Sequence, residues 1–340
     1  MRRRLRRIAP SRVRDRRCIS WIASVWLGLW LHLLVALGLF WLTFAIARAI
    51  GAAPNMKLVW GLLYGLAAAV TAYGTLNAFF VRVQHVEVQL KNLPESWTGK
   101  TIVQLSDVHL GSIRGLRFLK GVIEKVNALE PEMVLITGDL FDGMGGDLES
   151  FAEPLRTFVA SKGVFFVAGN HEGYLGLTRP LAVVERADIR ILDDEVIDID
   201  GLQVVGVSFP EFSMVNKGQS VARLAEQIDR DKPSILLYHT PTDVAESSDG
   251  RAAQQSRTYF SPDVEFSFDR ETGIDLQLSG HTHQGQFLPF TYVTKRIFNG
   301  YHYGLHTFGD LTIYITSGTG TWGPPLRTGS NSEIVAIRLR

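Results

Sequence analysis

Residues 102–109 read IVQLSDVH, and their pattern predicts the fold of most of the chain. Its first four residues form a short run rich in Val, Ile and Leu, typical of a buried strand, and the run leads directly into Asp107 and His109. Apolar residues at helical spacing between positions 116 and 129 predict that a helix follows. Four later runs also end in polar residues: 133–136 before Asp139, 164–168 before Asn170 and His171, 235–238 before His239, and 276–278 before His281 and His283. Alternating strands and helices indicate a layered α/β fold.

The polar residues all follow the carboxyl end of a predicted strand. In α/β sheets, ligand sites form at the carboxyl ends of the strands. The segments after these runs contain five of the nine histidines in the chain, a concentration that scattered core histidines would not produce. Imidazole and carboxylate ligands without thiolate suit Zn, Fe, Mn, Co or Ni. The sequence therefore predicts a metal site at this edge of the sheets.

Cysteine content and charge exclude several classes of protein. The single cysteine, Cys18, excludes a disulfide within the chain and a cysteine-rich zinc site. Residues 1–17 carry nine arginines and one aspartate, a net charge of 9 − 1 = +8, whereas residues 83–340 carry 23 Lys and Arg and 33 Asp and Glu, or 23 − 33 = −10. Because an acidic body repels a phosphate backbone, we expect no nucleic-acid binding.

Two uncharged runs near the N-terminus predict a pair of transmembrane helices. Residues 18–47 and 58–81 contain no Asp, Glu, Lys or Arg, and these runs of 30 and 24 residues exceed the roughly 20 residues that span a bilayer. Both are too long for the apolar region of a signal peptide, which is about 7–15 residues. The expected division is a basic tail at 1–17, a two-helix hairpin at 18–82 and one large domain at 83–340. We expect His32 to form a hydrogen bond within the hairpin. Gly61 and Gly65 are small residues four positions apart, a spacing that allows two helices to pack closely against each other.

The basic residues predict the orientation of this hairpin. Nine arginines precede the first run, Arg48 and Lys57 lie between the runs, and Arg82 and Lys91 follow the second. The positive-inside rule then places both the tail and the domain in the cytoplasm, in a multi-pass protein of the inner (plasma) membrane. The alternative is export, since Arg16 and Arg17 precede an apolar run. On this division, removal of residues 1–82 should release a soluble, active domain.

Five motifs together carry a resemblance to a known family. They are Asp107-x-His109, Gly138-Asp139-x-x-Asp142, Gly169-Asn170-His171-Glu172, His239 and Gly280-His281-x-His283. In order and approximate spacing this set resembles the calcineurin-like metallophosphoesterase family, from about residue 85 to the C-terminus. The segments 280–286 (GHTHQGQ) and 317–327 (SGTGTWGPPLR) are similar to a bacterial, membrane-associated, phosphodiesterase-like branch. The resemblance implies a four-layer αββα sandwich built on two mixed sheets.

The resemblance also implies a role for each residue. Asp107, His109 and His283 would hold one divalent ion, Asn170, His239 and His281 a second, and Asp139 would bridge them; Mn, Fe, Zn and Co all suit these ligands. The two ions would activate a hydroxide for attack on phosphorus. His171 would protonate the leaving group and Asp142 would orient it, although Asp142 is also a common turn residue. Glu172 would be structural, as a partner to a ligand histidine.

These roles imply a membrane-anchored, metal-dependent phosphodiesterase or pyrophosphatase whose phosphoester substrate is a free or a lipid-linked molecule. The alternatives are a phosphomonoesterase, a pyrophosphatase of a UDP-linked lipid precursor, and a metal-binding membrane protein without activity. Gly143 stands where protein phosphatases of the family usually carry arginine, which disfavours phosphoprotein substrates. Arg327 could bind a substrate phosphate or form a surface ion pair, and the polar segment 246–270 reads as a surface loop or a lid.

Overall fold

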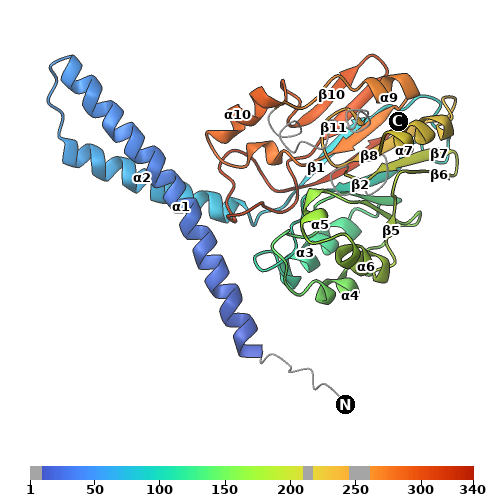
Figure 1. Ribbon diagram of the computed structural model, residues 1–340, viewed down its shortest axis with the longest axis horizontal. Coiled ribbons are helices and arrows are strands. Elements are labelled where there is room, and N and C mark those ends of the chain that lie inside the picture. The colour runs from blue at the N-terminus through green and yellow to red at the C-terminus, as the bar shows by residue number, and fades with distance from the viewer. Residues whose placement is uncertain (1–9, 210–216, 245–260) are drawn as a thin grey trace.

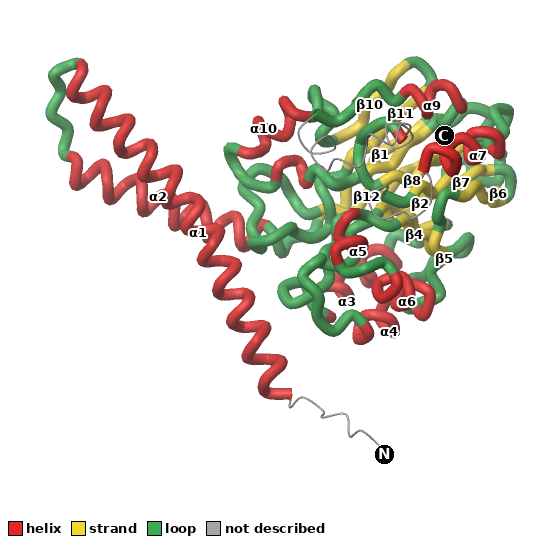
Figure 2. Tube along the Cα trace, in the orientation of Figure 1, coloured by secondary structure: helices red, strands yellow, loops and turns green. Residues whose placement is uncertain are grey.

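The computed structural model describes residues 10–209, 217–244 and 261–340, with only the backbone described for 10–17 and 217–220. It consists of two projecting helices and a layered domain (Figures 1 and 2). Most of the 246–270 segment, and the arginines of residues 1–9, therefore lie outside the described residues.

The first sheet contains the strands that carry three of the predicted site segments. Among the described residues it has six strands in the order β1-β12-β2-β3-β4-β5. Strands β2, β3, β4 and β5 are parallel, β12 is antiparallel to β2, and β1 is parallel to β12. The bounds are Arg82–Val88 for β1, Glu333–Leu339 for β12, Thr101–Leu105 for β2, Met133–Thr137 for β3, Val164–Val167 for β4 and Arg190–Ile191 for β5.

The second sheet carries the other two site segments. Its described strands, also six, follow the order β10-β11-β9-β8-β7-β6, with β7, β8, β9 and β11 parallel and β6 and β10 antiparallel at the edges. The bounds are Gly304–Phe308 for β10, Leu311–Ile315 for β11, Leu276–Ser279 for β9, Ser234–Tyr238 for β8, Leu202–Val207 for β7 and Glu195–Ile199 for β6. The five strands predicted from apolar runs are thus β2, β3, β4, β8 and β9.

Three hydrophobic clusters define the four layers. The middle cluster lies between the sheets and includes Leu135 of β3 and Leu237 of β8. A second cluster packs helix α3 (Leu116–Asn127), the short helices η1 (Glu149–Phe151) and α4 (Ala152–Leu155), and α6 (Thr178–Arg186) on the outer face of the first sheet. The third packs α7 (Lys217–Gln227) and α9 (Ser267–Thr272) on the outer face of the second sheet. The predicted αββα sandwich and the predicted helix between the first two strands are confirmed.

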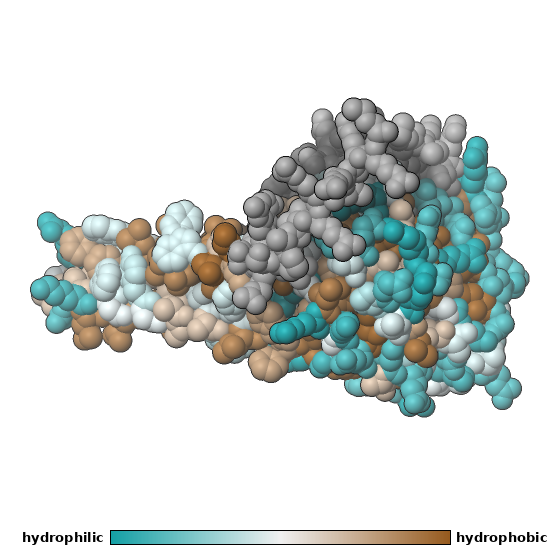
Figure 3. Space-filling model, turned by 90° about the horizontal axis from the view of Figure 1, so that it is seen from below, coloured by the Kyte–Doolittle hydropathy of each residue, from teal (hydrophilic) through white to brown (hydrophobic). Residues whose placement is uncertain are grey.

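The projecting helices are long and apolar enough to cross a membrane. Helix α1 (Pro10–Ala49) contains a candidate span at Cys18–Ala49, and α2 (Met56–Asn77) is the second candidate. In Figure 3 most of their surface is brown to pale, with teal residues at the far end, whereas the visible face of the domain is a mixture of teal and brown. His32 Nδ1 lies 2.9 Å from Thr71 Oγ1 of the other helix, as expected. Gly61 and Gly65 instead face open space, because α2 turns its Ala67–Thr71–Gly74 side inward.

The end of α2 differs from the sequence prediction. The helix ends at Asn77 rather than at 81, and β1 begins at Arg82, so four residues join the hairpin to the domain. Ala78 and Val81 are buried there, and Val81 belongs to the cluster on the outer face of the first sheet. The buried Arg114 donates to Ala78 O at 2.8 Å and lies over the ring of Phe79. These contacts place residues 78–81 in the packing of the domain.

Candidate metal centre

The site lies where strands from both sheets end. Asp107 and His109 follow β2, Asp139 and Asp142 follow β3, and Asn170 and His171 follow β4 at the start of the short helix α5 (Asn170–Tyr174). His239 follows β8, His281 follows β9, and His283 opens the 3-10 helix η4 (His283–Gly285). The fold therefore brings together all nine residues that the sequence singled out.

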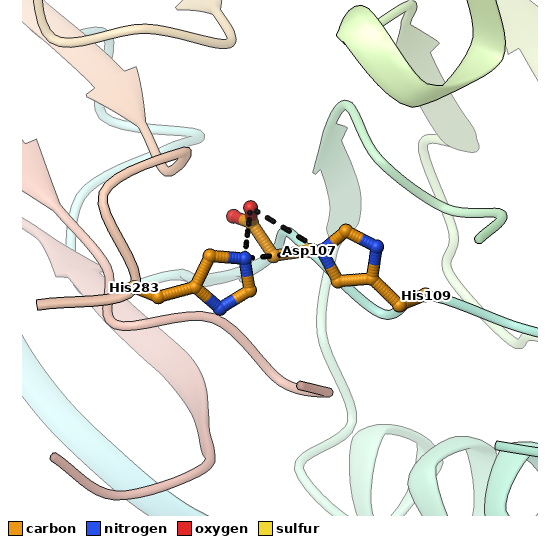
Figure 4. Close-up of side chains that lie close together, drawn as sticks. All are labelled: Asp107, His109 and His283. Atoms are coloured by element: carbon orange, nitrogen blue, oxygen red, sulfur yellow. Dashed lines mark hydrogen bonds and ion pairs between the residues drawn. The ribbon is translucent and has the colours of Figure 1, made fainter. Parts of the chain in front are cut away.

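The first group consists of Asp107, His109 and His283 (Figure 4). His283 Nε2 lies 3.0 Å from His109 Nε2 and 3.1 Å from Asp107 Oδ1. All three side chains are buried, and Asp107 Oδ1 accepts no hydrogen bond of good geometry from the described residues. A buried carboxylate oxygen without a hydrogen bond is energetically costly. Together with the two imidazole nitrogens that face it, this oxygen forms a set of donors that suits a divalent cation.

The second group consists of Asn170, His239 and His281. Asn170 Oδ1 lies 3.0 Å from His239 Nε2 and 3.2 Å from His281 Nδ1, and the two ring nitrogens are 3.2 Å apart. His239 Nδ1 lies 2.8 Å from Thr137 O, a contact that leaves Nε2 free to face the group. One amide oxygen and two imidazole nitrogens again converge on one point.

Asp139 lies between the two groups. Its Oδ2 is 3.3 Å from His239 Nε2 and 4.0 Å from His109 Nε2. Its other oxygen, Oδ1, accepts a hydrogen bond of 2.9 Å from the backbone N–H of His171. A single oxygen, Oδ2, is therefore shared by the two groups.

His171 lies beside Asp139, with its Nε2 3.9 Å from Asp139 Oδ2. The backbone N–H of Gly143 donates to His171 Nδ1 at 3.0 Å, whereas Asp142 Oδ1 is 3.8 Å from the same nitrogen. Since Nδ1 accepts this bond, a neutral His171 carries its proton on Nε2, the nitrogen that faces the site. The contact that sets this tautomer thus comes from a backbone amide rather than from Asp142.

A family model for calcineurin-like phosphoesterases matches residues 100–285, which is 186 of 340 residues and includes every residue of the two groups. The chain belongs to the calcineurin-like phosphoesterase family. It is therefore a metal-dependent phosphoesterase, a hydrolase.

Relatives of this phosphoesterase occur in bacteria and animals. An uncharacterized metallophosphoesterase of Campylobacter jejuni is 31% identical over 84% of this chain and 71% of its own length. One from Helicobacter pylori is 35% identical over 70% of this chain and 59% of its own length. A Danio rerio protein named as a transmembrane protein with a metallophosphoesterase domain is 32% identical over 81% of this chain and 61% of its own length. The chain thus spans between about three fifths and seven tenths of these relatives.

Glu172 positions the shared carboxylate of the phosphoesterase. Its two oxygens accept hydrogen bonds from the backbone N–H groups of Asp139 (2.9 Å), Phe141 (3.0 Å) and Gly169 (2.8 Å). The structural role predicted for Glu172 is thus correct in kind, but its partners are backbone amides and not a ligand histidine. Burial and the neighbouring Asp139 raise the pKa of Glu172 to about 7.

The electrostatics of the site favour the protonation states that bind cations. Burial raises the pKa of Asp107, but the nearby His283, His239 and His109 have the larger, opposite effect. The net result is a pKa well below the usual range of an aspartate. Burial and neighbouring histidines lower the pKa of His109, and burial with His239 lowers that of His281 to about 3. Ionised carboxylates and neutral imidazoles are the forms that a metal ion needs. His239 is the exception: burial lowers its pKa, but Asp139 raises it to about 9.

Several backbone positions in the phosphoesterase site are strained. Positive φ angles between 49° and 66° occur at five of the seven predicted ligands, namely Asp107, His109, Asp139, His281 and His283. Such conformations cost on the order of 1–3 kcal/mol each and are maintained by the surrounding structure. Gly280 shows how tight that structure is, because a Cβ there would lie 2.2 Å from Asp107 Oδ2.

Arg327 occupies neither of its expected places. Its side chain is fully buried and its guanidinium donates to the carbonyl oxygens of Ser317 and Gly320, both at 2.7 Å. It therefore forms no surface ion pair and is not open to a substrate. Burial lowers the pKa of Arg327 to about 10, so the group stays charged at neutral pH.

Proposed function

We propose that this phosphoesterase binds two divalent ions and hydrolyses a phosphodiester or pyrophosphate bond at the membrane. The observation that carries the proposal is the position of Asp139 Oδ2 between two sets of three donors. Asp107, His109 and His283 would hold one ion, Asn170, His239 and His281 the other, and Mn, Fe, Zn or Co would suit both sites. When bound, such a pair supplies an activated water and neutralises the phosphoryl oxygens.

His171 would act as the general acid. The proton on Nε2 faces the site, and Gly143 N–H fixes the ring through Nδ1. Donation requires the imidazolium form, in which a proton on Nδ1 replaces the Gly143 contact. As the bond from phosphorus to the leaving oxygen breaks, Nε2 of the imidazolium would give its proton to that oxygen, the departing group would leave as an alcohol or a phosphate, and the ring would become neutral. Asp142 Oδ1, 3.8 Å from Nδ1, lies near enough for its carboxylate to stabilise the positively charged ring of His171.

His171→Ala should retain its metal and lose about 10²–10⁴-fold in turnover on substrates with alkyl leaving groups. The loss should be much smaller for nitrophenyl leaving groups, which depart without protonation. Rates of the full-length protein on nitrophenyl and alkyl phosphodiesters measure this difference. An equal loss on both would contradict the proton-donor role.

The same assay separates the candidate substrate classes. We expect bis-nitrophenyl phosphate to be hydrolysed faster than nitrophenyl phosphate, and the reverse order would favour a phosphomonoesterase. A pyrophosphatase of a UDP-linked lipid precursor is the alternative that best suits a membrane hairpin, and it would act on a pyrophosphate bond in preference to either ester. No turnover on any of these by the metal-loaded chain would favour a metal-binding protein without activity.

The membrane proposal places the domain in the cytoplasm, held by α1 and α2 as a multi-pass anchor in the inner membrane. Nine arginines before the candidate span at Cys18–Ala49 oppose translocation of the tail, and two spans return the chain to the same side. A reporter fused after Arg340 that is active only in the cytoplasm should give signal. Signal from a reporter active only outside would instead support export.

A further inference from the structure

The last turn of α2 holds a loop of the domain that we call the arginine loop, residues 326–331. The backbone N–H of Arg327 donates to Gly74 O at 2.9 Å. Asn77 Nδ2 donates to Arg327 O at 3.0 Å and to Ser330 O at 3.1 Å, and Asn77 is only 5% exposed. Two residues of the membrane hairpin thus fix the backbone on both sides of Arg327.

This contact is close enough to require a glycine in α2. A Cβ at Gly74 would lie 2.5 Å from Thr328 Cγ2 and 2.8 Å from Leu326 Cδ1. Any side chain at position 74 would therefore push the arginine loop away from the helix.

The side chain of Arg327 passes from this loop towards the first group of donors. Its Nη2 donates to Ser317 O and Gly320 O, both at 2.7 Å, and lies 3.4 Å from His283 Nδ1. Its Nη1 donates to Ser330 Oγ at 2.6 Å. The guanidinium therefore joins the arginine loop to residues 317–320 and to the ring of His283.

Residues 317–320 in turn hold the backbone that carries Asp107. The N–H groups of Thr319 and Gly320 donate to Ser106 O at 2.9 Å and to Asp107 O at 2.8 Å. A continuous set of buried hydrogen bonds thus runs from α2 to the backbone of Asp107, and the guanidinium lies against the ring of His283. The second group lies on other elements, at the start of α5 and the ends of β8 and β9.

We propose that the last turn of α2 is a positioning element for the metal site of Asp107, His109 and His283, acting through Arg327. This inference rests on the proposed two-ion site. It predicts that a substitution that disrupts the contact between α2 and the arginine loop weakens binding of the ion at Asp107, His109 and His283. The ion at Asn170, His239 and His281 should stay bound.

The test is binding of Mn²⁺ alone to the full-length chain in detergent, by equilibrium dialysis with elemental analysis. Asn77→Ala should bind one of two ions about 10- to 100-fold more weakly, the loss typical of groups that orient ligands. At a Mn²⁺ concentration that just saturates the wild type, it should hold one ion per chain. Thr75→Ala is the matched control, because its hydroxyl donates to Thr71 O within α2, and it should hold two.

A second pair of variants guards against simple misfolding. Gly74→Ala should show the same loss of one ion. Adding Thr328→Ser should restore part of the affinity, because serine lacks the Cγ2 that makes the closest clash but keeps the Oγ that accepts from Leu288 N–H, whereas the contact with Leu326 Cδ1 remains. Two ions at wild-type affinity in folded Asn77→Ala or Gly74→Ala, or equal loss of both ions, would overturn the positioning role. A wild-type chain that never holds two ions would overturn the proposed function itself.

Discussion

Asp139→Asn should remove most of the bound metal and reduce turnover by at least about 10³-fold, at the upper end of the loss seen when one preorganised electrostatic contact is removed. The reason is that Asp139 Oδ2 lies between both groups of donors, so the substitution withdraws a negative charge from two ions at once. Asparagine keeps the shape of the side chain and the oxygen that accepts from His171 N–H. The fold should therefore survive.

Elemental analysis of the purified variant, with turnover on a phosphodiester, measures the effect. Asp310→Asn is the control, since Asp310 is 77% exposed and pairs with Lys91 at the surface. Full occupancy of Asp139→Asn with two ions would show that the shared oxygen is not a bridge.

Removal of residues 1–82 should leave a chain that does not fold into a stable domain, contrary to the expectation from the sequence. The cut would remove Ala78 and Val81 from the core and would take the carbonyl of Ala78 from the buried Arg114. Arg114 would keep Thr321 Oγ1 as an acceptor, and the lost hydrogen bond from a charged group costs about 1.5–3 kcal/mol. Loss of the buried Val81 side chain costs about 1.5–3 kcal/mol more, and the two together are a large part of a total stability of about 5–15 kcal/mol.

A chain that begins at residue 70 is the matched comparison, because it keeps Gly74, Asn77 and residues 78–81. We expect it to unfold at a temperature well above that of the chain beginning at residue 83 and to recover metal binding. Thermal unfolding of both, followed by circular dichroism, decides the point. Equal unfolding temperatures would show that the hairpin is only a tether.

The sequence predicted five of the interior strands and the residues at their ends because both depend on local patterns, but it did not predict β7, β11 and β12, which are also interior. Short apolar runs mark β2, β3, β4, β8 and β9, which are buried on both faces, and their polar ends converge by the geometry of the sheets. The edge strands β1 and β10 consist mostly of exposed and partly buried residues, so they lack the continuous apolar run that marks a buried strand.

What the sequence could not predict depends on backbone groups and distant contacts. The tautomer of His171 is set by an amide of Gly143, and a glycine in a sequence gives no sign of such a donor. Asn77 and Ser330 are 253 positions apart, so nothing in the local pattern joins them. Arg327 looked like a surface or substrate group because its buried partners are carbonyl oxygens, which every residue carries.

The junction between α2 and β1 determines what the enzyme can reach. Four residues span at most about 14 Å when fully extended, and here two of them are buried in the domain. With the hairpin in a bilayer, the catalytic centre is held at a nearly constant height above the lipid and turns only as the hairpin turns. Substrate search is then confined to two dimensions. A molecule that diffuses in the same leaflet meets the centre at a high local concentration, whereas a large soluble substrate has to approach the membrane surface itself.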